Sequence, residues 1–378
     1  MQGPSSEISR VERVCLSLWA CVLAGWCALV AIHYYQNGER GMLLDFSAFW
    51  TAGKLALAGE PMVVWDKAAF QAALETGEGP EGSYLPWFYP PTFHMLVTPF
   101  GVLPFPLGFG LWSLLGAGLF WVMMHRVNPD RFTPTVVAPS VFLAMAIGNN
   151  ALLFGAALAL ALTQIQRPVL AGLAISLLSL KPGLGPVIAL ALLAGRRWSI
   201  IFWASLGSLG LAAAATAIFG FPYWLAFLDS LEIAVNRITP QAEETRRMIS
   251  WFAFARLEGW EREAASALHI GIFVTITAGT MFIWSLRGIS HDWQCAALCL
   301  AVALTSPHAF HYEMVYSLVA IAFMIRGGLG PVGWLLCGLL WLGPIVQVLE
   351  PRPFPITSFA APLLTTTFAY VLLRALRG

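Results

Sequence analysis

The sequence predicts an all-α integral membrane protein with about 10–13 membrane helices. Of its 378 residues, 58% are hydrophobic and only 11% are charged, and the mean hydropathy is +0.73. Soluble domains carry far more charge, so this composition excludes a soluble protein. No basic tract indicates a nucleic-acid partner, and the lipid bilayer is the expected surrounding. The six cysteines all lie inside apolar runs, where we interpret them as packing residues.

The apolar runs predict the positions of the helices. Several runs are shorter than the roughly 20 residues that span a bilayer, so some are expected to be re-entrant or paired halves. The first run resembles a signal peptide, but it is too long and lacks a convincing cleavage site, so we predict a membrane helix there. The runs are 14–33, 106–125, 133–147, 150–166, 168–180, 183–194, 198–219, 267–286, 293–306, 312–326, 329–349 and 356–373.

The distribution of arginines predicts how the chain is oriented. If the N-terminus is cytoplasmic, arginine clusters fall beside the cytoplasmic helix ends, as the positive-inside rule requires. We therefore predict a multi-pass protein of the bacterial inner membrane with both termini cytoplasmic. The two long connections, 34–105 and 220–266, then lie on the periplasmic side, and the active site is expected there. The clustered arginines are Arg10, Arg13, Arg126, Arg131, Arg167, Arg196, Arg197, Arg287, Arg326, Arg374 and Arg377.

The first long connection combines helix-forming stretches with a rigid turn. FSAFWTAGKLALAG and DKAAFQAALE predict amphipathic helices at the membrane interface. Between them and the next apolar run, SYLPWFYPPTF places Trp87 and Tyr89 among prolines. Such aromatic residues usually form a belt that fixes membrane depth, but rings held by prolines also suit a sugar or a prenyl chain.

Asp45 is a carboxylate in apolar surroundings, within GMLLDFSAFW. A carboxylate is costly there unless it is paired or used, and its pKa would be raised toward the range of a general base. The alternative is a helix N-cap, because aspartate before FSAFWTAGK would cap well. Position alone favours neither interpretation.

Polar residues mark two outer helix junctions. Asn149 and Asn150 follow AMAIG, and Lys181 stands before Pro182 at the end of SLLSLKP. A lysine at an outer helix end departs from the positive-inside trend and could pair with a phosphate at the bilayer surface. Snorkelling of the lysine is the alternative that needs no ligand.

The segment SPHAFHYEM brings His308, His311 and Glu313 together where a helix re-enters the membrane. The two histidines could hold a metal or donate to a phosphate, and with a single carboxylate beside them we favour the phosphate and expect no metal. Arg246 and Arg247, in the second long connection, are further anion-binding candidates, although the glutamates of that segment could pair with them.

Taken in order, Asp45, the aromatic-YPP motif, GNN, KP and SPHxxHY resemble the motifs of glycosyltransferase family 87, also catalogued as DUF2029. The resemblance runs from about Asp45 to Tyr312. Each motif is weak alone, but their order makes the set specific. The family includes polyprenol-phosphate-mannose-dependent mannosyltransferases. This chain departs from it at Gly148-Asn149-Asn150, where members commonly have Gly-Gln-x-Asn, and at RRMISWFAF, where they often have Asn-Gln-Ser.

The resemblance implies a single GT-C-type multi-helix bundle over residues 1–378 and an inverting hexosyltransferase or related glycosyltransferase. Its donor would be a polyprenyl-phosphate sugar, carrying mannose or another hexose or pentose, and its acceptor a lipid or glycan, with no cofactor. Asp45 would be the general base. The residues implied to bind the donor phosphate are Lys181, His308, His311, Arg246 and Arg247. Those implied to contact substrate are Tyr89, Trp87, Asn149, Asn150 and Glu313.

Two other hypotheses remain open from the sequence. A flippase or carrier of lipid-linked sugars would also use many helices with polar ends, but carriers need polar groups near the bilayer midplane, and these helices contain almost none. An inactive scaffold with intact motifs is the other.

Overall fold

The structure is a computed structural model that describes residues 44–77, 85–131, 133–236, 243–345 and 357–377, and a few positions between 14 and 25. It is 82% helix, with no strand among the described residues. The predicted all-α membrane fold is therefore confirmed. Most of the predicted first helix, 14–33, lies outside the described residues.

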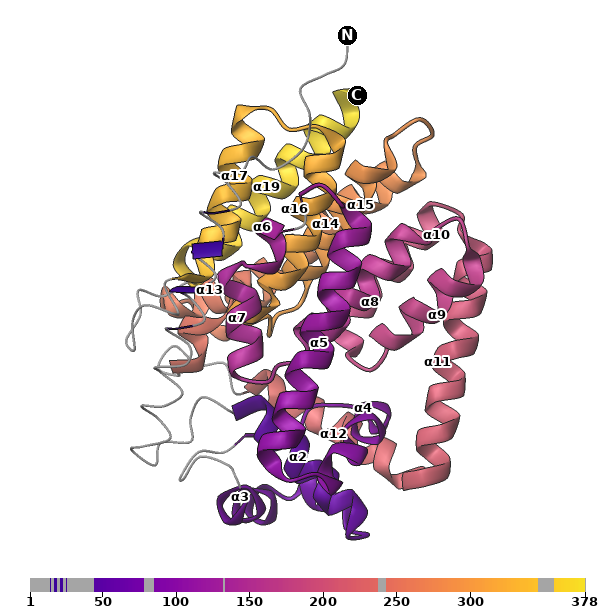
Figure 1. Cartoon of the computed structure of the whole chain (residues 1–378), viewed down its shortest axis with the longest axis vertical. Coiled ribbons are helices and arrows are strands. Elements are labelled where there is room, and N and C mark those ends of the chain that lie inside the picture. The colour runs from indigo at the N-terminus through magenta and orange to yellow at the C-terminus, as the bar shows by residue number, and fades with distance from the viewer. Residues whose placement is uncertain are drawn as a thin grey trace.

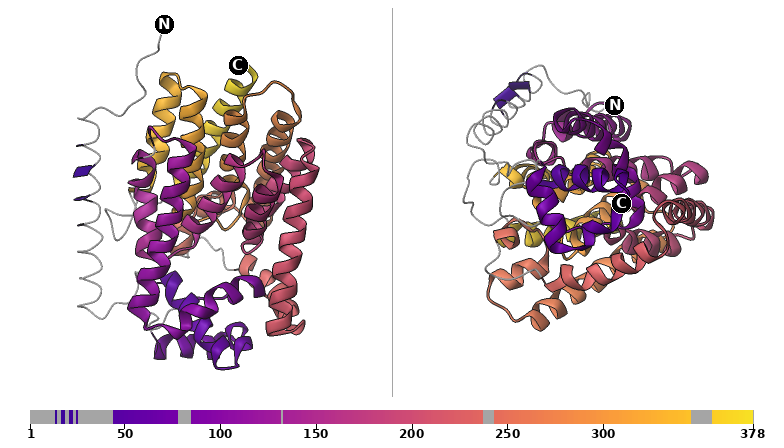
Figure 2. Two further views of the ribbon diagram at one scale, coloured as in Figure 1. Left: turned by 45° about the vertical axis from the view of Figure 1, so that its right-hand side comes forward. Right: turned by 90° about the horizontal axis from the view of Figure 1, so that it is seen from below.

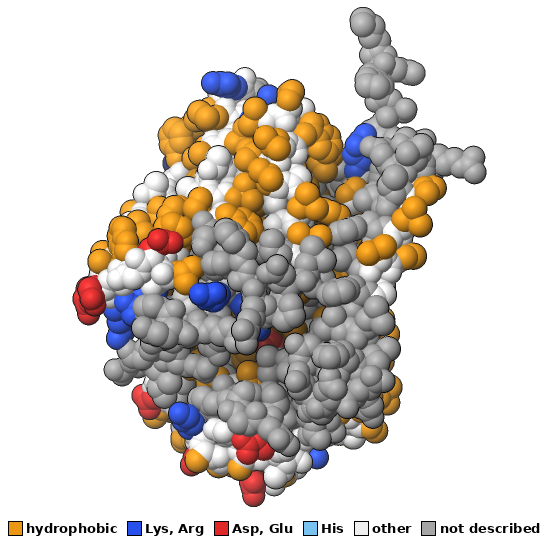
Figure 3. All heavy atoms as spheres, turned by 90° about the vertical axis from the view of Figure 1, so that its left-hand side faces the viewer, with side chains coloured by type: hydrophobic (Ala, Val, Ile, Leu, Met, Phe, Trp, Pro, Cys, Tyr) orange, Lys and Arg blue, Asp and Glu red, His pale blue; other side chains and the backbone are white. Residues whose placement is uncertain are grey.

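Four described helices are long and apolar enough to cross a membrane: α5 (Phe105–Val127), α11 (Trp198–Phe219), α14 (Arg262–Ser285) and α19 (Thr357–Arg377). Large hydrophobic side chains on α5 and α11 are exposed along the helix length, such as Leu114 at 66% and Leu209 at 68%. With about 1.5 Å per residue, each of these helices covers the roughly 30 Å of a bilayer core. On the face seen in Figure 3, hydrophobic side chains cover much of the described upper part of the molecule.

Shorter apolar helices pack between the long ones, as the short apolar runs predict. Many of them begin or end at a proline or a glycine. These residues end helices, because proline lacks a backbone N–H and glycine has a low helix propensity. Thirteen-residue α8 rises only about 20 Å and so cannot cross a bilayer. These helices are α6 (Thr133–Val136), α7 (Pro139–Ala146), α8 (Ala151–Thr163), α9 (Pro168–Leu178), α10 (Gly185–Ala194), α15 (His291–Thr305), α16 (Val315–Gly327) and α17 (Pro331–Leu342).

The first long connection folds into a cap at the end of the bundle opposite the C-terminal end of α19 (Figures 1 and 2). Both helices expected there are present, the second capped by the Asp66 carboxylate, which accepts from the N–H groups of Ala68 and Ala69. The cap comprises α2 (Leu44–Leu57), η2 (Pro61–Trp65), α3 (Lys67–Thr76), α4 (Pro91–Val97) and η3 (Thr98–Val102).

The second long connection contributes α12 (Pro222–Asn236), η5 (Glu243–Arg247) and α13 (Trp251–Leu257). Helix α12 is tied to the cap through His94 on α4, whose Nε2–H donates to the Ala52 carbonyl 2.8 Å away. Its Nδ1 accepts from the Tyr223 hydroxyl. Burial lowers the pKa of His94 to about 4, so this ring is neutral and suited to that pair of bonds. One buried side chain thus connects α2, α4 and α12.

The helix ends predicted to be cytoplasmic meet at the end opposite the cap. Arg326 donates to the Val127 carbonyl at 3.0 Å and pairs with Asp292 at 3.3 Å. Arg374 donates to the Gly328 carbonyl at 2.9 Å. These contacts connect α5, α15, α16 and α19 at the ends that carry arginine. The side of the membrane on which each end lies stays a prediction.

Candidate active site

Four segments that are distant in the sequence meet between the cap and the short helices. The first turn of α2 supplies Asp45, and the α7–α8 turn supplies Asn149 and Asn150. Lys181 lies three residues after the end of α9, and Glu313 is on η6 (His311–Met314). Each polar residue stands where a helix begins or ends. The site therefore depends on several helices ending at the same level of the bundle.

Asp45 is held by the turn between α7 and α8. The Asn149 Nδ2 donates to the Asp45 Oδ2 at 2.5 Å, and the Asn149 Oδ1 accepts from the Ala151 N–H at 2.7 Å, which fixes the orientation of the amide. The Phe46 N–H also donates to the Ile147 carbonyl at 3.2 Å. The carboxylate is thus engaged across the fold, as a functional group would be.

The environment of Asp45 raises its pKa to about 6. Burial is the main cause, because it disfavours the charged form, and the negative Glu313 acts in the same direction. The Asn149 amide, Lys181 and the Tyr312 hydroxyl lower it. A carboxylate with this pKa is largely ionised at neutral pH and remains basic enough to accept a proton.

Lys181 forms an ion pair with Glu313. The Glu313 side chain is 3% exposed, whereas that of Lys181 is 20% exposed. The ammonium also lies 3.5 Å from the Asn150 Oδ1, at the limit of a hydrogen bond. The second Glu313 oxygen accepts from the Phe310 N–H at 3.0 Å. The lysine is therefore partly open to a ligand, and its partner is fixed inside the protein.

The aromatic turn before α4 closes one side of the cluster. Tyr89 stacks on Phe93 with ring centroids 4.2 Å apart, and its hydroxyl lies beside the Asn150 amide. Burial and the negative Asp45 raise the pKa of Tyr89, so it remains a phenol. Trp87 is 1% exposed and packs edge-on against Phe49. Tyr89 thus belongs to the cluster, whereas Trp87 lies within the aromatic core of the cap.

His308 and His311 lie on the segment that leads to Glu313. Burial lowers the pKa of His308 to about 4 and that of His311 to about 3, so neither carries a charge at neutral pH. The His311 Nδ1–H donates to the Arg247 carbonyl at 3.2 Å, which leaves Nε2 as an acceptor in the neutral ring. His311 in this tautomer suits a hydroxyl donor better than a phosphate oxygen.

The predicted arginines occupy different environments. Arg246 is exposed on η5, and Arg247 is half-buried beside His311. Their roles as phosphate ligands stay predictions.

Tyr312 contacts Asp45 and was not singled out from the sequence, although it lies within the same SPHAFHYEM motif as His308, His311 and Glu313. Within the described ranges, no group of three His, Cys, Asp or Glu side chains could hold a metal.

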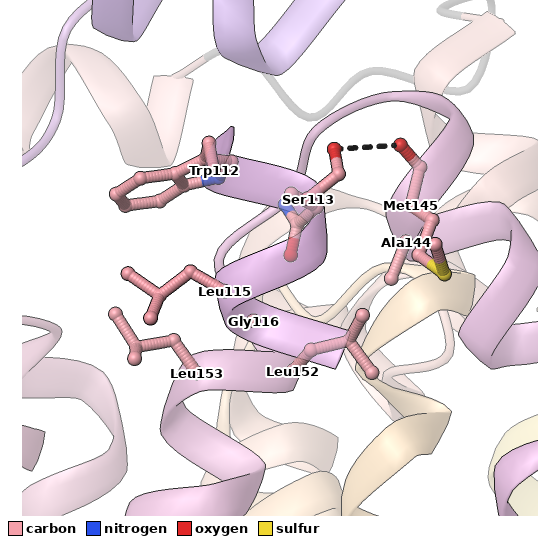
Figure 4. A pocket seen from close by; sticks show the side chains of 9 residues that line it. Trp112, Ser113, Leu115, Gly116, Ala144, Met145, Leu152 and Leu153 are labelled. Atoms are coloured by element: carbon pink, nitrogen blue, oxygen red, sulfur yellow. Dashed lines mark hydrogen bonds between the residues drawn. The ribbon is translucent and has the colours of Figure 1, made fainter. Parts of the chain in front are cut away.

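A small apolar pocket reaches Asn149 from between α5, α7 and α8 (Figure 4). The Ser113 hydroxyl donates to the Met145 carbonyl at 3.3 Å along its edge. The Trp112 Nε1–H donates to the Gly148 carbonyl at 2.9 Å. These two bonds fasten the turn that carries Asn149 to the spanning helix α5.

Gly148 is required by the shape of that turn. Its φ is +65°, a left-handed conformation that glycine adopts without strain. A Cβ there would lie 2.5 Å from the Phe46 Cβ, so α2 would have to move. We expect Gly148→Ala to destabilise the protein by about 1–3 kcal/mol and to displace Asn149 from Asp45.

The measurement is the thermal unfolding midpoint in detergent, followed by an activity assay. Gly110→Ala is the matched control, because a Cβ at Gly110 on α5 meets no atom within 4 Å. Equal midpoints and equal activities for the two variants would contradict the requirement for glycine at this turn.

Comparison with known proteins identifies the family. The sequence profile of glycosyltransferase family 87 matches residues 87–307, more than half of the chain. The chain belongs to glycosyltransferase family 87. Asp45 and Glu313 lie outside the matched range, which is shorter than the resemblance read from the motifs. No curated protein and no solved structure matches the chain.

Membership of family 87 indicates a glycosyltransferase, and the site contains groups suited to that activity. A sugar transfer needs a base for the acceptor hydroxyl and positive or N–H groups for the leaving group. Asp45 is a carboxylate and Lys181 a cation, and the two interact electrostatically. In this family 87 site, the Asn149 amide bonds to Asp45, and Glu313 pairs with Lys181.

Proposed function

We propose that this family 87 protein is an inverting GT-C glycosyltransferase that moves a sugar from a polyprenyl-phosphate donor to a lipid or glycan acceptor at the periplasmic face of the inner membrane. The observation that carries the proposal is the juxtaposition of Asp45, Asn149, Lys181 and Glu313, four residues from separate helix junctions in one half-buried cluster. A base and a cation at one membrane site fit a donor whose leaving group is a phosphate.

In the proposed reaction, Asp45 accepts the proton of an acceptor hydroxyl, whose oxygen attacks the anomeric carbon. The bond from that carbon to the phosphate oxygen breaks, and polyprenyl phosphate leaves with the bonding electrons. Lys181 stabilises the charge that develops on the phosphate. Asn149 orients the Asp45 carboxylate through the 2.5 Å bond. One displacement inverts the anomeric configuration, and no sugar is bonded to the protein.

The depth of the site supports a donor that arrives within the bilayer. On α5, Trp112 bonds to Gly148 and lies seven residues from the helix start at Phe105, about 10 Å along the axis. A Cβ on Gly207 of α11 would touch the Ser176 side chain near the end of α9, and Gly207 lies about 18 Å from the cap end of α11 at Phe219. Exposed apolar side chains on both helices therefore extend past the level of the cluster toward the cap, which supports a donor that approaches the site from the surrounding lipid.

An apolar groove between α9 and α11 supports a long hydrocarbon substrate. It is lined by Leu170, Leu173, Leu177 and Leu211. Helix α9 leads from this groove to Lys181, two residues after Ser179 caps the helix. A prenyl chain in the groove would direct its phosphate toward the lysine, and its burial would contribute about 25 cal/mol per Å².

The test is transfer by the purified protein in liposomes, with a panel of labelled polyprenyl-phosphate sugars and with membrane lipid and glycan extracts as acceptors. Formation of a labelled glycoside with one donor establishes the enzyme and names the sugar. Movement of the labelled donor across the bilayer with no glycoside would favour the carrier hypothesis instead.

The pH dependence of transfer should report Asp45. Because the base must be ionised, we expect kcat/KM to fall as the pH decreases through about 6, the pKa of Asp45. Asn149→Ala removes a donor that favours the ionised form, so it should raise the pKa and move the acid limb to higher pH. A profile that is flat from pH 8 to pH 4 would rule out a carboxylate base with this pKa.

A further inference from the structure

Glu313 is buried and uses both of its oxygens inside the protein. One oxygen pairs with Lys181, and the other accepts from the Phe310 N–H at 3.0 Å. Its side chain is 3% exposed, so little of it is open to a substrate. The family resemblance implies that Glu313 contacts substrate, whereas in the structure one of its oxygens is directed at Lys181 and the other at the backbone. A buried carboxylate in this position needs a structural explanation, because an unpaired charge there would be costly.

The three protons of the Lys181 ammonium give a geometric reason for that arrangement. One is directed at Glu313 and a second at the Asn150 Oδ1, 3.5 Å away. The third remains for a ligand on the side where the lysine is exposed. Without these two acceptors, a lysine with four rotatable side-chain bonds would sample many positions. Donor binding would then have to order the side chain, and this loss of conformational entropy would weaken the binding.

We propose that Glu313 is a positioning residue that acts through Lys181, holding the ammonium beside Asn150 so that it meets the donor phosphate. The proposal rests on the proposed function, because it assumes a phosphate ligand for Lys181. It differs from direct contact between Glu313 and the acceptor, which would change acceptor binding and leave the binding of polyprenyl phosphate unaffected.

The influence on Asp45 follows from the charges that face it. Among the residues that the structure describes, the titratable groups that act on Asp45 are Lys181, Glu313, Tyr312 and Tyr89. The negative Glu313 raises the pKa of Asp45, and the hydrogen bond from Tyr312 lowers it. Removing the Glu313 charge should therefore lower the pKa of Asp45 as long as Lys181 stays beside Asn150, and removing the Tyr312 hydroxyl should raise it. The two changes have opposite signs, which a general loss of structure would not produce.

The decisive variant is Glu313→Gln, which is nearly isosteric and can still accept from the Phe310 N–H. Donor KM is expected to rise roughly tenfold, because the ammonium loses a charged anchor, and the acid limb of kcat/KM should move to lower pH. Tyr312→Phe should move the acid limb to higher pH. Glu313→Asp keeps the charge but shortens the side chain, so it should raise KM while the acid limb stays near its wild-type position.

Binding of polyprenyl phosphate, measured by the change in intrinsic tryptophan fluorescence, provides a readout without turnover. We expect weaker binding to the Glu313→Gln variant than to the wild type. A lower donor KM in that variant would overturn the proposal, because it would mean that Glu313 competes with the phosphate for Lys181. So would an effect on acceptor KM alone with an unchanged acid limb, which would place Glu313 against the acceptor.

The same binding measurement separates this proposal from the function on which it rests. If the wild type binds polyprenyl phosphate and Glu313→Gln binds it equally well, only the positioning role is wrong. If the wild type binds no polyprenyl phosphate, the proposed function is wrong and the positioning role falls with it.

Discussion

Replacing Asp45 by asparagine is expected to lower transfer by about 10²–10⁴-fold while binding of polyprenyl phosphate persists. Asparagine keeps the shape of the side chain but cannot accept a proton from an acceptor hydroxyl. The Asn149 amide can still donate to its carbonyl oxygen, so the contact between α2 and the α7–α8 turn should survive. The measurement is initial-rate transfer at saturating donor, together with polyprenyl-phosphate binding.

Asp66→Asn provides the matched control for that variant. Asp66 is an exposed carboxylate in the same cap, where it accepts from two N–H groups at the start of α3. Asparagine caps helices about as well as aspartate, so this change should leave both folding and transfer unchanged. Wild-type rates for Asp45→Asn would exclude Asp45 as the base, whatever the result for Asp66.

Replacing Lys181 by methionine is expected to lower kcat/KM for the donor by about 10²–10³-fold, because the developing phosphate charge loses its cation. Binding of polyprenyl phosphate should weaken by about 10-fold or more. This pattern differs from that of Asp45→Asn, which spares binding. The measurement is the donor KM and kcat, with binding followed separately.

The variant at Lys181 needs two controls. Lys181→Met leaves Glu313 buried without its partner, which could destabilise the protein. The double variant Lys181→Met/Glu313→Gln removes both charges and should fold while still failing to bind the phosphate. Lys54→Met removes an exposed lysine on α2 and should behave as the wild type. Normal donor binding by the double variant would show that the phosphate lies elsewhere.

The helices of the bundle could be predicted because hydropathy alone defines them. Runs such as 106–125 and 198–219 correspond to α5 and α11 with ends that differ by at most two residues. The start of α14 was predicted at 267, but the helix begins at Arg262, because its first turn is polar and hydropathy detects only apolar turns. Helix α12 was not predicted, since it lies in a mixed segment that was read only as a long connection.

The sequence singled out most of the residues that meet in the cluster, but it did not indicate the pairings among them, and their roles stay predictions. Asp45, Lys181 and Glu313 could be identified because they are charged side chains beside apolar segments, where charge is rare. Their contacts join residues 104 and 132 positions apart, and no local pattern encodes such contacts. The sequence left Asp45 equally a cap or a base, and the bond to Asn149 favours the functional interpretation. Burial of His308 and His311 was likewise invisible, so their neutral state at physiological pH was not foreseen.

If Asp45 acts as the base of a single displacement, the glycoside must have the anomeric configuration opposite to that of the donor. The wild-type protein would be supplied with a donor of known configuration, and the glycoside would be examined by NMR before it can equilibrate. Inversion at the anomeric carbon is the expected result. Retention would mean that the acceptor does not displace the phosphate from the opposite face, and it would exclude the single displacement proposed for Asp45.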